Sequence, residues 1–307
     1  MCKLLIIPKV TKRTQTSARK FAEAITPYLS QYDQDGVGYM ALGEHGLFGE
    51  RWLNPEDAFE ARGASKLDSA ILGRYGAVLE ASPTYNSFGE VSDTFTCFAL
   101  HTRMATSEYG LHNTHPFVSD DTALIHNGVI QNPAKHKMQM STCDSEVILT
   151  DYTSHNVANR IDNIELVSQG LEGYFACAVI SKDTENRWIL DVFKDDRANL
   201  SAVYVPKLKT VVFVTDPQHV IDACADLNWT VGSVFKFTDN TLVRHDAVSG
   251  KVIEYVSFTR PELIKTGYKE RISSIDISAI REALDAQNSD DAPDDGYAEY
   301  LRAMASG

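Results

Sequence analysis

The sequence of 307 residues lacks features that would each point to a particular class of protein. No apolar run approaches the ~20 residues that a membrane-spanning helix requires. Lys and Arg, 29 in all, form no cluster and are outnumbered by 42 Asp and Glu, so the formal net charge is −13. Phosphate backbones and anionic lipid surfaces attract clustered positive charge. We therefore expect neither nucleic acid nor a membrane among the partners.

Paired cysteines are also missing. The five cysteines are an odd number, are widely spaced and include no Cys-x-x-Cys pair, so neither a disulfide framework nor a zinc site is expected. Residues 1–8 have no signal-peptide layout. The sequence therefore predicts a cytoplasmic protein, and no motif in it predicts a metal ion or an organic cofactor.

One cysteine, Cys2, directly follows the initiator Met1. Removal of Met1 would place a thiol and a free α-amine on the same residue. A free α-amine has a pKa near ~8, so part of it is an unprotonated base at neutral pH. A neighbouring base makes the reactive thiolate available. Cys2 could thus supply both nucleophile and base, although a cysteine can also follow Met1 by chance.

Hydrophobic patterning predicts one strand-rich domain with a few helices. Strands are expected at residues 3–7, 95–102, 123–125, 128–130, 174–181, 188–193, 202–206, 211–215, 234–238, 241–246 and 252–258. Helices are expected at residues 17–32, 144–155, 163–169, 217–225 and 275–286. An acidic stretch with Pro and Gly, residues 288–296, reads as a linker before a short helical pattern at 297–305.

Four motifs lie downstream of Cys2, and each is weak by itself. They are His101-Thr102-Arg103, Asn113-Thr114-His115-Pro116, His126-Asn127-Gly128-Val129-Ile130 and Cys143-Asp144-Ser145-Glu146. Asn127-Gly128 is also a common β-hairpin turn, and Asp144 could be a helix N-cap and nothing more. Single histidines are more often packed in a core than functional. The order and spacing of the motifs carry the information.

With the N-terminal cysteine, this series resembles the class II glutamine amidotransferases, which are N-terminal nucleophile (Ntn) hydrolases. The opening residues and the Asp35-Gly36-Val37-Gly38 turn look most like the short, standalone members. The resemblance implies an α+β fold, a four-layer αββα sandwich of two stacked antiparallel sheets. The amidotransferase domain would span residues 1–286, with 43–95 as a poorly matching insertion or lid and 287–307 as an acidic linker and short helix.

The resemblance assigns roles to individual residues. Cys2 would attack the amide carbon, and the side chain of Asn127 with the backbone N–H of Gly128 would form the oxyanion hole. Arg103 would hold the α-carboxylate of glutamine through a bidentate fork, and Asp144 would pair with its ammonium. Thr106 would lie in the glutamine pocket. Three residues would support the site: His101, Asn113 and His115.

The implied function is hydrolysis of the glutamine amide to glutamate and ammonia, a transferase or hydrolase activity. No second, acceptor-binding motif is evident after residue 258, so the ammonia acceptor is expected on a separate enzyme. Two alternatives stay open: hydrolysis of another γ-glutamyl amide, and a non-enzymatic binding or scaffold subunit. Many family members have Trp after the arginine, where this chain has Met104. A homo-oligomer is also left open.

Overall fold

A computed structural model describes residues 2–31, 35–44, 46–53, 94–105, 110–133, 141–154 and 160–260. Several predictions fall outside these residues. They concern Thr106, most of the segment 43–95, and the linker and helices expected after residue 260. Within the described part of the chain, no helix is both long and apolar enough to cross a membrane.

The described strands form two sheets, in which every recorded pairing is antiparallel. The first has the order β11-β9-β10-β1-β4-β2-β3. Its strands are β1 Lys3–Ile7, β2 Gly36–Gly43, β3 Gly46–Trp52, β4 Phe95–Arg103, β9 Ser201–Val205, β10 Thr210–Val214 and β11 Val234–Lys236. The second has the order β13-β12-β8-β7-β6-β5. Its strands are β5 Phe117–Ser119, β6 Thr122–Ile130, β7 Gly173–Lys182, β8 Trp188–Lys194, β12 Thr241–Asp246 and β13 Val252–Ser257.

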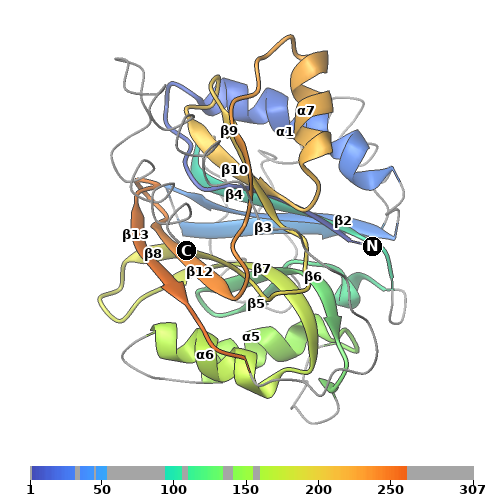
Figure 1. The fold of residues 1–307 in the computed structure, drawn as a ribbon, viewed down its shortest axis with the longest axis vertical. Helices are drawn as coiled ribbons and strands as arrows, with labels where there is room; N and C mark the ends of the chain where they lie inside the picture. The colour runs from blue at the N-terminus through green and yellow to red at the C-terminus, as the bar shows by residue number, and fades with distance from the viewer. Residues whose placement is uncertain are drawn as a thin grey trace.

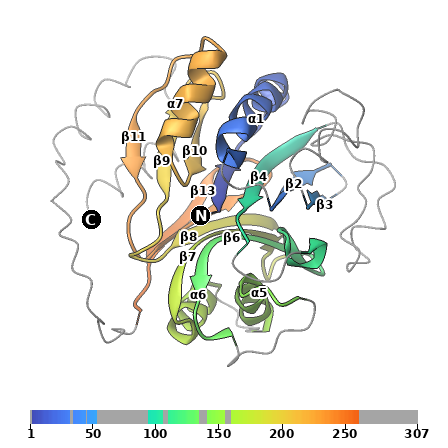
Figure 2. The ribbon, with the colours of Figure 1, turned by 90° about the vertical axis from the view of Figure 1, so that its right-hand side faces the viewer.

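Helices cover the outer faces of the two stacked sheets (Figures 1 and 2). Helices α1 (Gln15–Ser30) and α7 (Pro217–Asp226) pack against each other and against the first sheet. Helices α5 (Ser145–Ser154) and α6 (Arg160–Gly170) lie on the far side of the second sheet. A short 3₁₀ helix, η1, spans Leu111–Asn113. The layers therefore confirm the predicted αββα sandwich.

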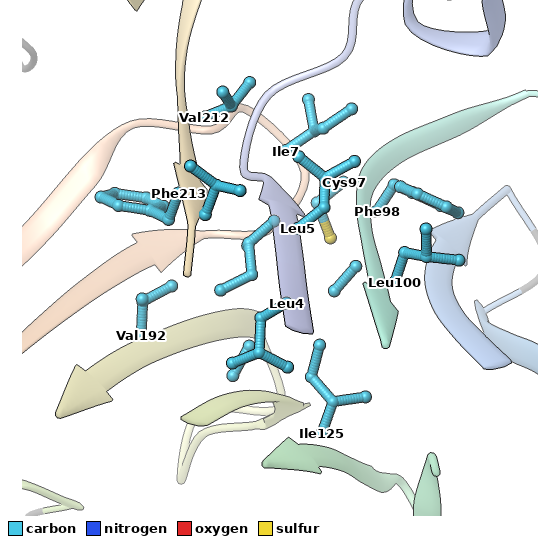
Figure 3. Packing of buried hydrophobic residues seen from close by; sticks show 14 of the residues in the cluster. Leu4, Leu5, Ile7, Cys97, Phe98, Leu100, Ile125, Val192, Val212 and Phe213 are labelled. Carbon is cyan, nitrogen blue, oxygen red and sulfur yellow. The ribbon is translucent and has the colours of Figure 1, made fainter. Parts of the chain in front are cut away.

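The main core lies between the two sheets and is centred on β1. All but the first residue of this strand are buried, since one face meets the second sheet and the other meets α1. Leu4 points toward Ile125 of β6, and Val192 of β8 lies beside them (Figure 3). A strand buried on both faces reads as a continuous apolar run, which is how residues 3–7 appear in the sequence. This core fixes the position of Cys2, which directly precedes β1.

The structure differs from the sequence-based expectation at three places. Gly36, Val37 and Gly38, expected in a turn, are the first residues of β2. Asn127-Gly128 is not a hairpin turn, and residues 123–125 and 128–130 are not separate strands. Both belong to β6, which pairs with β7 without interruption from Ala123↔Ile180 to Ile130↔Gly173. Within the segment 43–95, residues 46–52 form β3 and complete the edge of the first sheet.

Candidate active site

The thiol of Cys2 lies against the end of β4. The backbone N–H of Met104 donates to Sγ of Cys2 over 3.3 Å, and the Met104 carbonyl oxygen is 3.5 Å from the same sulfur. The register of β1 and β4, with Lys3 opposite Thr102, creates this contact. The Met104 N–H can donate to the sulfur, and the Met104 carbonyl oxygen can accept from the thiol S–H. Sequence reasoning missed this role of Met104, which the pairing of the two strands explains.

Arg103 is the last residue of β4 and is only 2% exposed. Asp35 holds the chain on both sides of Met104. Its backbone N–H donates to the Arg103 carbonyl over 3.0 Å, and its carboxylate accepts from the Ala105 N–H over 2.7 Å. The sequence marked Asp35 as part of a turn but gave it no role. Asp35, which directly precedes β2, therefore fixes the segment that contacts Cys2.

Asn127 and Gly128 lie within β6, which contacts both β1 and β4 of the first sheet. Asn127 is 2% exposed. Gly128 has φ +156°, and a Cβ there would come within 2.6 Å of Nε2 of His126 and 2.9 Å of Cα of Phe175. Glycine is therefore required at this position, because any side chain would collide with its neighbours.

The backbone of Gly128 faces away from β7. Its partner in the register is Phe175, whose own N–H and C=O bond to Asp195 on the other side of β7. Two residues along β6, the Ile130 N–H donates to the carboxylate of Asp144 over 2.6 Å. Since N–H groups at positions i and i+2 of a strand point the same way, the Gly128 N–H lies on the edge of β6 that faces Asp144.

The loop that carries Asp144 is anchored by side chains on both sides. Asn113 is buried, and its amide exchanges two hydrogen bonds with Thr142, at 2.8 and 2.9 Å. The carboxylate of Glu146 accepts from the backbone N–H and the hydroxyl of Ser141, both at 2.7 Å. Asp144 itself is half-buried and directly precedes α5. Glu146 is a further contributor to which sequence reasoning gave no role, although it closes the Asp-Ser-Glu motif.

Three buried histidines connect the sheets beneath this site. The ring centroids of His101 and His115 are 3.9 Å apart, and those of His115 and His126 are 6.3 Å apart. Burial lowers the pKa of His101 to about 3 and brings those of His115 and His126 below the ordinary value of 6.5. The rings are therefore neutral near pH 7 and serve as packed, polar links. Gly38 permits this packing, because a Cβ there would run into the His115 carbonyl.

The described site residues thus gather in one region. Cys2 and Arg103 lie at the same end of the β1–β4 pair, and both strands pack on β6, which carries Asn127 and Gly128. Burial raises the pKa of the Cys143 thiol, and the positive charge of Arg103 partly opposes this effect. Cys143 directly precedes Asp144, the other residue expected to bind glutamine. Thr106 falls outside the described residues.

Comparison with known proteins gives partial sequence matches. A glutamine–fructose-6-phosphate aminotransferase (isomerizing) of Bacteroides thetaiotaomicron is 37% identical over 130 residues, 38% of this chain and 21% of the relative. The enzyme of the same name from Francisella tularensis is 34% identical over 93 residues, 27% of this chain and 15% of the relative. The alignments thus cover 15% to 21% of these relatives' length. No protein-family model matches the chain.

Solved structures give a broader match. Glutamine phosphoribosylpyrophosphate amidotransferase from B. subtilis, complexed with ADP and GMP, has a TM-score of 0.55 at 14% identity, covering 84% of this chain and 49% of that one. An allosteric regulatory enzyme of purine biosynthesis has a TM-score of 0.55 at 13% identity, with coverage of 80% and 47%. The fold is therefore that of the Ntn hydrolases. The motifs and the partial sequence matches make this chain similar to the glutamine amidotransferases, and the structural matches show that it shares their fold.

Proposed function

We propose that this chain hydrolyses the side-chain amide of glutamine, with Cys2 as the nucleophile. The observation that carries the proposal is the position of Cys2, whose sulfur receives the Met104 N–H beside the buried Arg103. The Gly128 N–H lies on the edge of β6 that the Asp144 carboxylate faces. A nucleophile, an oxyanion donor and two opposite charges for the amino-acid end thus belong to one region of the fold.

The proposed reaction has two steps. After removal of Met1, the α-amine of Cys2 takes the thiol proton, and the thiolate attacks the amide carbon of glutamine. Asn127 and the Gly128 N–H stabilise the tetrahedral oxyanion, and the C–N bond then breaks as the α-amine returns its proton to the departing ammonia. Water hydrolyses the resulting thioester, which releases glutamate and regenerates Cys2.

Ammonia release and covalent labelling test this function together. The purified chain is incubated with L-glutamine, and ammonia and glutamate are measured in equal amounts. Intact mass after treatment with 6-diazo-5-oxo-L-norleucine, a glutamine-like affinity label, should show loss of Met1 and one adduct. Turnover of other γ-glutamyl amides without turnover of glutamine would favour the alternative function, hydrolysis of another γ-glutamyl amide. No turnover and no adduct on a chain that begins at Cys2 would leave a binding subunit.

The two charged residues should control glutamine binding. Arg103→Lys and Asp144→Asn are each expected to lower kcat/KM for glutamine by about ten- to a hundredfold, mainly through KM. A charge-assisted hydrogen bond contributes ~1.5–3 kcal/mol, and a lysine cannot form the bidentate fork. Steady-state ammonia release measures the effect. Arg187→Lys, on an arginine half exposed in a surface ion pair, is the matched control and should change nothing.

Normal glutamine kinetics in both variants would contradict this assignment of the charge clamp. A γ-glutamyl amide whose amino-acid end is masked would then be a better substrate. Asp222→Asn, in an exposed contact with Gln218 on α7, is the control for loss of a carboxylate.

We further propose that the ammonia acceptor is a separate protein and that the C-terminal segment, residues 287–307, contributes to assembly with it or with a second copy of this chain. The cytoplasmic location stays a prediction. Truncation after Ala286 should keep basal glutaminase activity, since every catalytic motif lies before residue 150. It should change the number of chains per particle, as measured by light scattering, or abolish binding of the acceptor enzyme. A control truncation removes only Ser306 and Gly307. If the number of chains per particle and the binding of the partner are both unchanged after removal of residues 287–307, this segment has no role in assembly.

A further inference from the structure

A chain of four side chains connects β6 with the loop that precedes α5. The Nδ1 atom of His126 lies 2.8 Å from Oγ of Ser145. The Cys143 sulfur lies 3.4 Å from the same hydroxyl and 3.6 Å from Oδ1 of Asp144. His126, Ser145 and Cys143 are all buried, with exposures of 2%, 2% and 5%. The proposed reaction uses none of these three groups directly.

The tautomer of the His126 ring sets the direction of its hydrogen bond with Ser145. Burial keeps the ring neutral by lowering its pKa, while the charge of Asp144 and the Tyr174 carbonyl oppose this shift. Nε2 has no partner in strict hydrogen-bond geometry, and the Tyr174 carbonyl is the acceptor on that side of the ring. In the tautomer with the hydrogen on Nε2, toward the Tyr174 carbonyl, Nδ1 accepts and the Ser145 hydroxyl donates.

This direction leaves one oxygen of Asp144 available. The Ser145 oxygen, having donated its hydrogen to His126, accepts the S–H of Cys143. The same sulfur lies within donating distance of Oδ1 of Asp144, at 3.6 Å, but a carboxylate oxygen has two lone pairs and can accept a second donor. The other oxygen, Oδ2, already accepts the Ile130 N–H. Oδ1 is thus oriented but still able to accept from an ammonium group.

Two tethers hold the Asp144 loop to β6, one at each side of the oxyanion-hole residues. The first joins Ser145 to His126, and the second joins Asp144 to Ile130. Asn127 and Gly128 lie between the two attachment points on the same strand. Because both tethers are short and the first is buried, the carboxylate and the oxyanion donors are kept at a fixed spacing.

We propose that Ser145 is a positioning residue that sets the Asp144 carboxylate relative to the oxyanion hole, and so sets selectivity for a substrate with a free α-ammonium. The proposal rests on the glutaminase function proposed above. Ser145 contacts no substrate atom and acts through His126 and Asp144. Loss of its hydroxyl frees the first turn of α5 to shift, and Asp144 moves with it.

The test compares two substrates that differ only in the ammonium group. They are L-glutamine and 4-carbamoylbutanoate, which has the same amide and carboxylate but no amine. In Ser145→Ala, the ratio of their kcat/KM values should fall by about tenfold, as expected when a displaced Asp144 loses a well-placed hydrogen bond to the substrate ammonium. Ser145→Thr keeps a hydroxyl and should preserve most of the ratio. Ser168→Ala removes another buried hydroxyl, on α6, and should leave the ratio unchanged.

A folded Ser145→Ala protein with an unchanged ratio would overturn the proposal, and so would an equal fall in Ser168→Ala. A separate readout uses ¹⁵N NMR of the His126 ring, assigned with His126→Gln. Nδ1 should show an accepted hydrogen bond in the wild type and lose it in Ser145→Ala. An unchanged resonance would exclude the tether. If the wild type does not hydrolyse glutamine, the proposed function is contradicted. The NMR measurement then still shows whether Ser145 donates a hydrogen bond to Nδ1 of His126.

Discussion

Replacement of Cys2 by alanine is expected to abolish glutamine hydrolysis and to leave the fold intact. Cys2 is the proposed nucleophile, and its α-amine is the proposed base. Removal of a catalytic nucleophile costs on the order of a thousandfold or more in kcat. The sulfur lies outside β1 and contacts the Met104 backbone, so its loss removes none of the buried apolar core. Ammonia release and a thermal melt measure the two expectations.

Two companion variants sharpen the result. Cys2→Ser keeps a nucleophilic atom of similar shape but should be nearly as inactive, since a hydroxyl is a far weaker nucleophile than a thiolate. Cys224→Ala, which removes a buried thiol from α7, should retain full activity. Substantial turnover by a folded Cys2→Ala protein would contradict the mechanism.

Retention of Met1 must be separated from absence of function. A chain that keeps Met1 has no free α-amine on Cys2 and should be inactive and unlabelled. A version whose leader is cleaved by a protease immediately before Cys2 should then gain activity. If that version reacts no faster than the chain with Met1, the α-amine is not the base.

Most of the fold could be predicted from hydrophobic patterning because its strands are bounded by clear turns. The expected strand at residues 3–7 coincides with β1, and the helix expected at 217–225 matches α7, where Asp216 caps the first turn. The hairpin signal of Asn127-Gly128 was misleading for a physical reason. Gly128 is required by its close approach to Phe175 and His126, not by a turn. Local sequence cannot distinguish these two causes.

The candidate site was predictable only where a motif carries a functional side chain. Arg103, Asp144 and Asn127 were proposed as site residues because their types and spacing resemble the pattern of a known family, and their roles stay predictions. The N–H of Met104 was missed because a backbone group has no sequence signature. The contact of Ser145 with His126 was not predicted, because it depends on how α5 packs against β6. Contacts between distant elements arise from the strand register and the packing of layers, which a single sequence does not specify.

The second large effect is expected from the oxyanion hole. Asn127→Ala should lower kcat by about a hundredfold or more with a smaller change in KM, since one such donor contributes ~3 kcal/mol in the transition state. Among the described residues, Oδ1 of Asn127 has no hydrogen-bond partner, so its amide is not fixed by a structural bond through that atom. The substitution should therefore cost little stability beyond the lost packing of a buried side chain.

Two further variants separate catalysis from structure. Asn127→Asp keeps the shape but replaces the donor with a negative charge beside the oxyanion, so its kcat should fall at least as far. Asn132→Ala is the matched control, because Asn132 hydrogen-bonds the Gly170 carbonyl and the Glu172 N–H near the turn between α6 and β7. It should lower the melting temperature with little effect on kcat. Rapid-quench and steady-state ammonia assays give kcat and KM separately, and an Asn127→Ala effect confined to KM would place this residue in ground-state binding.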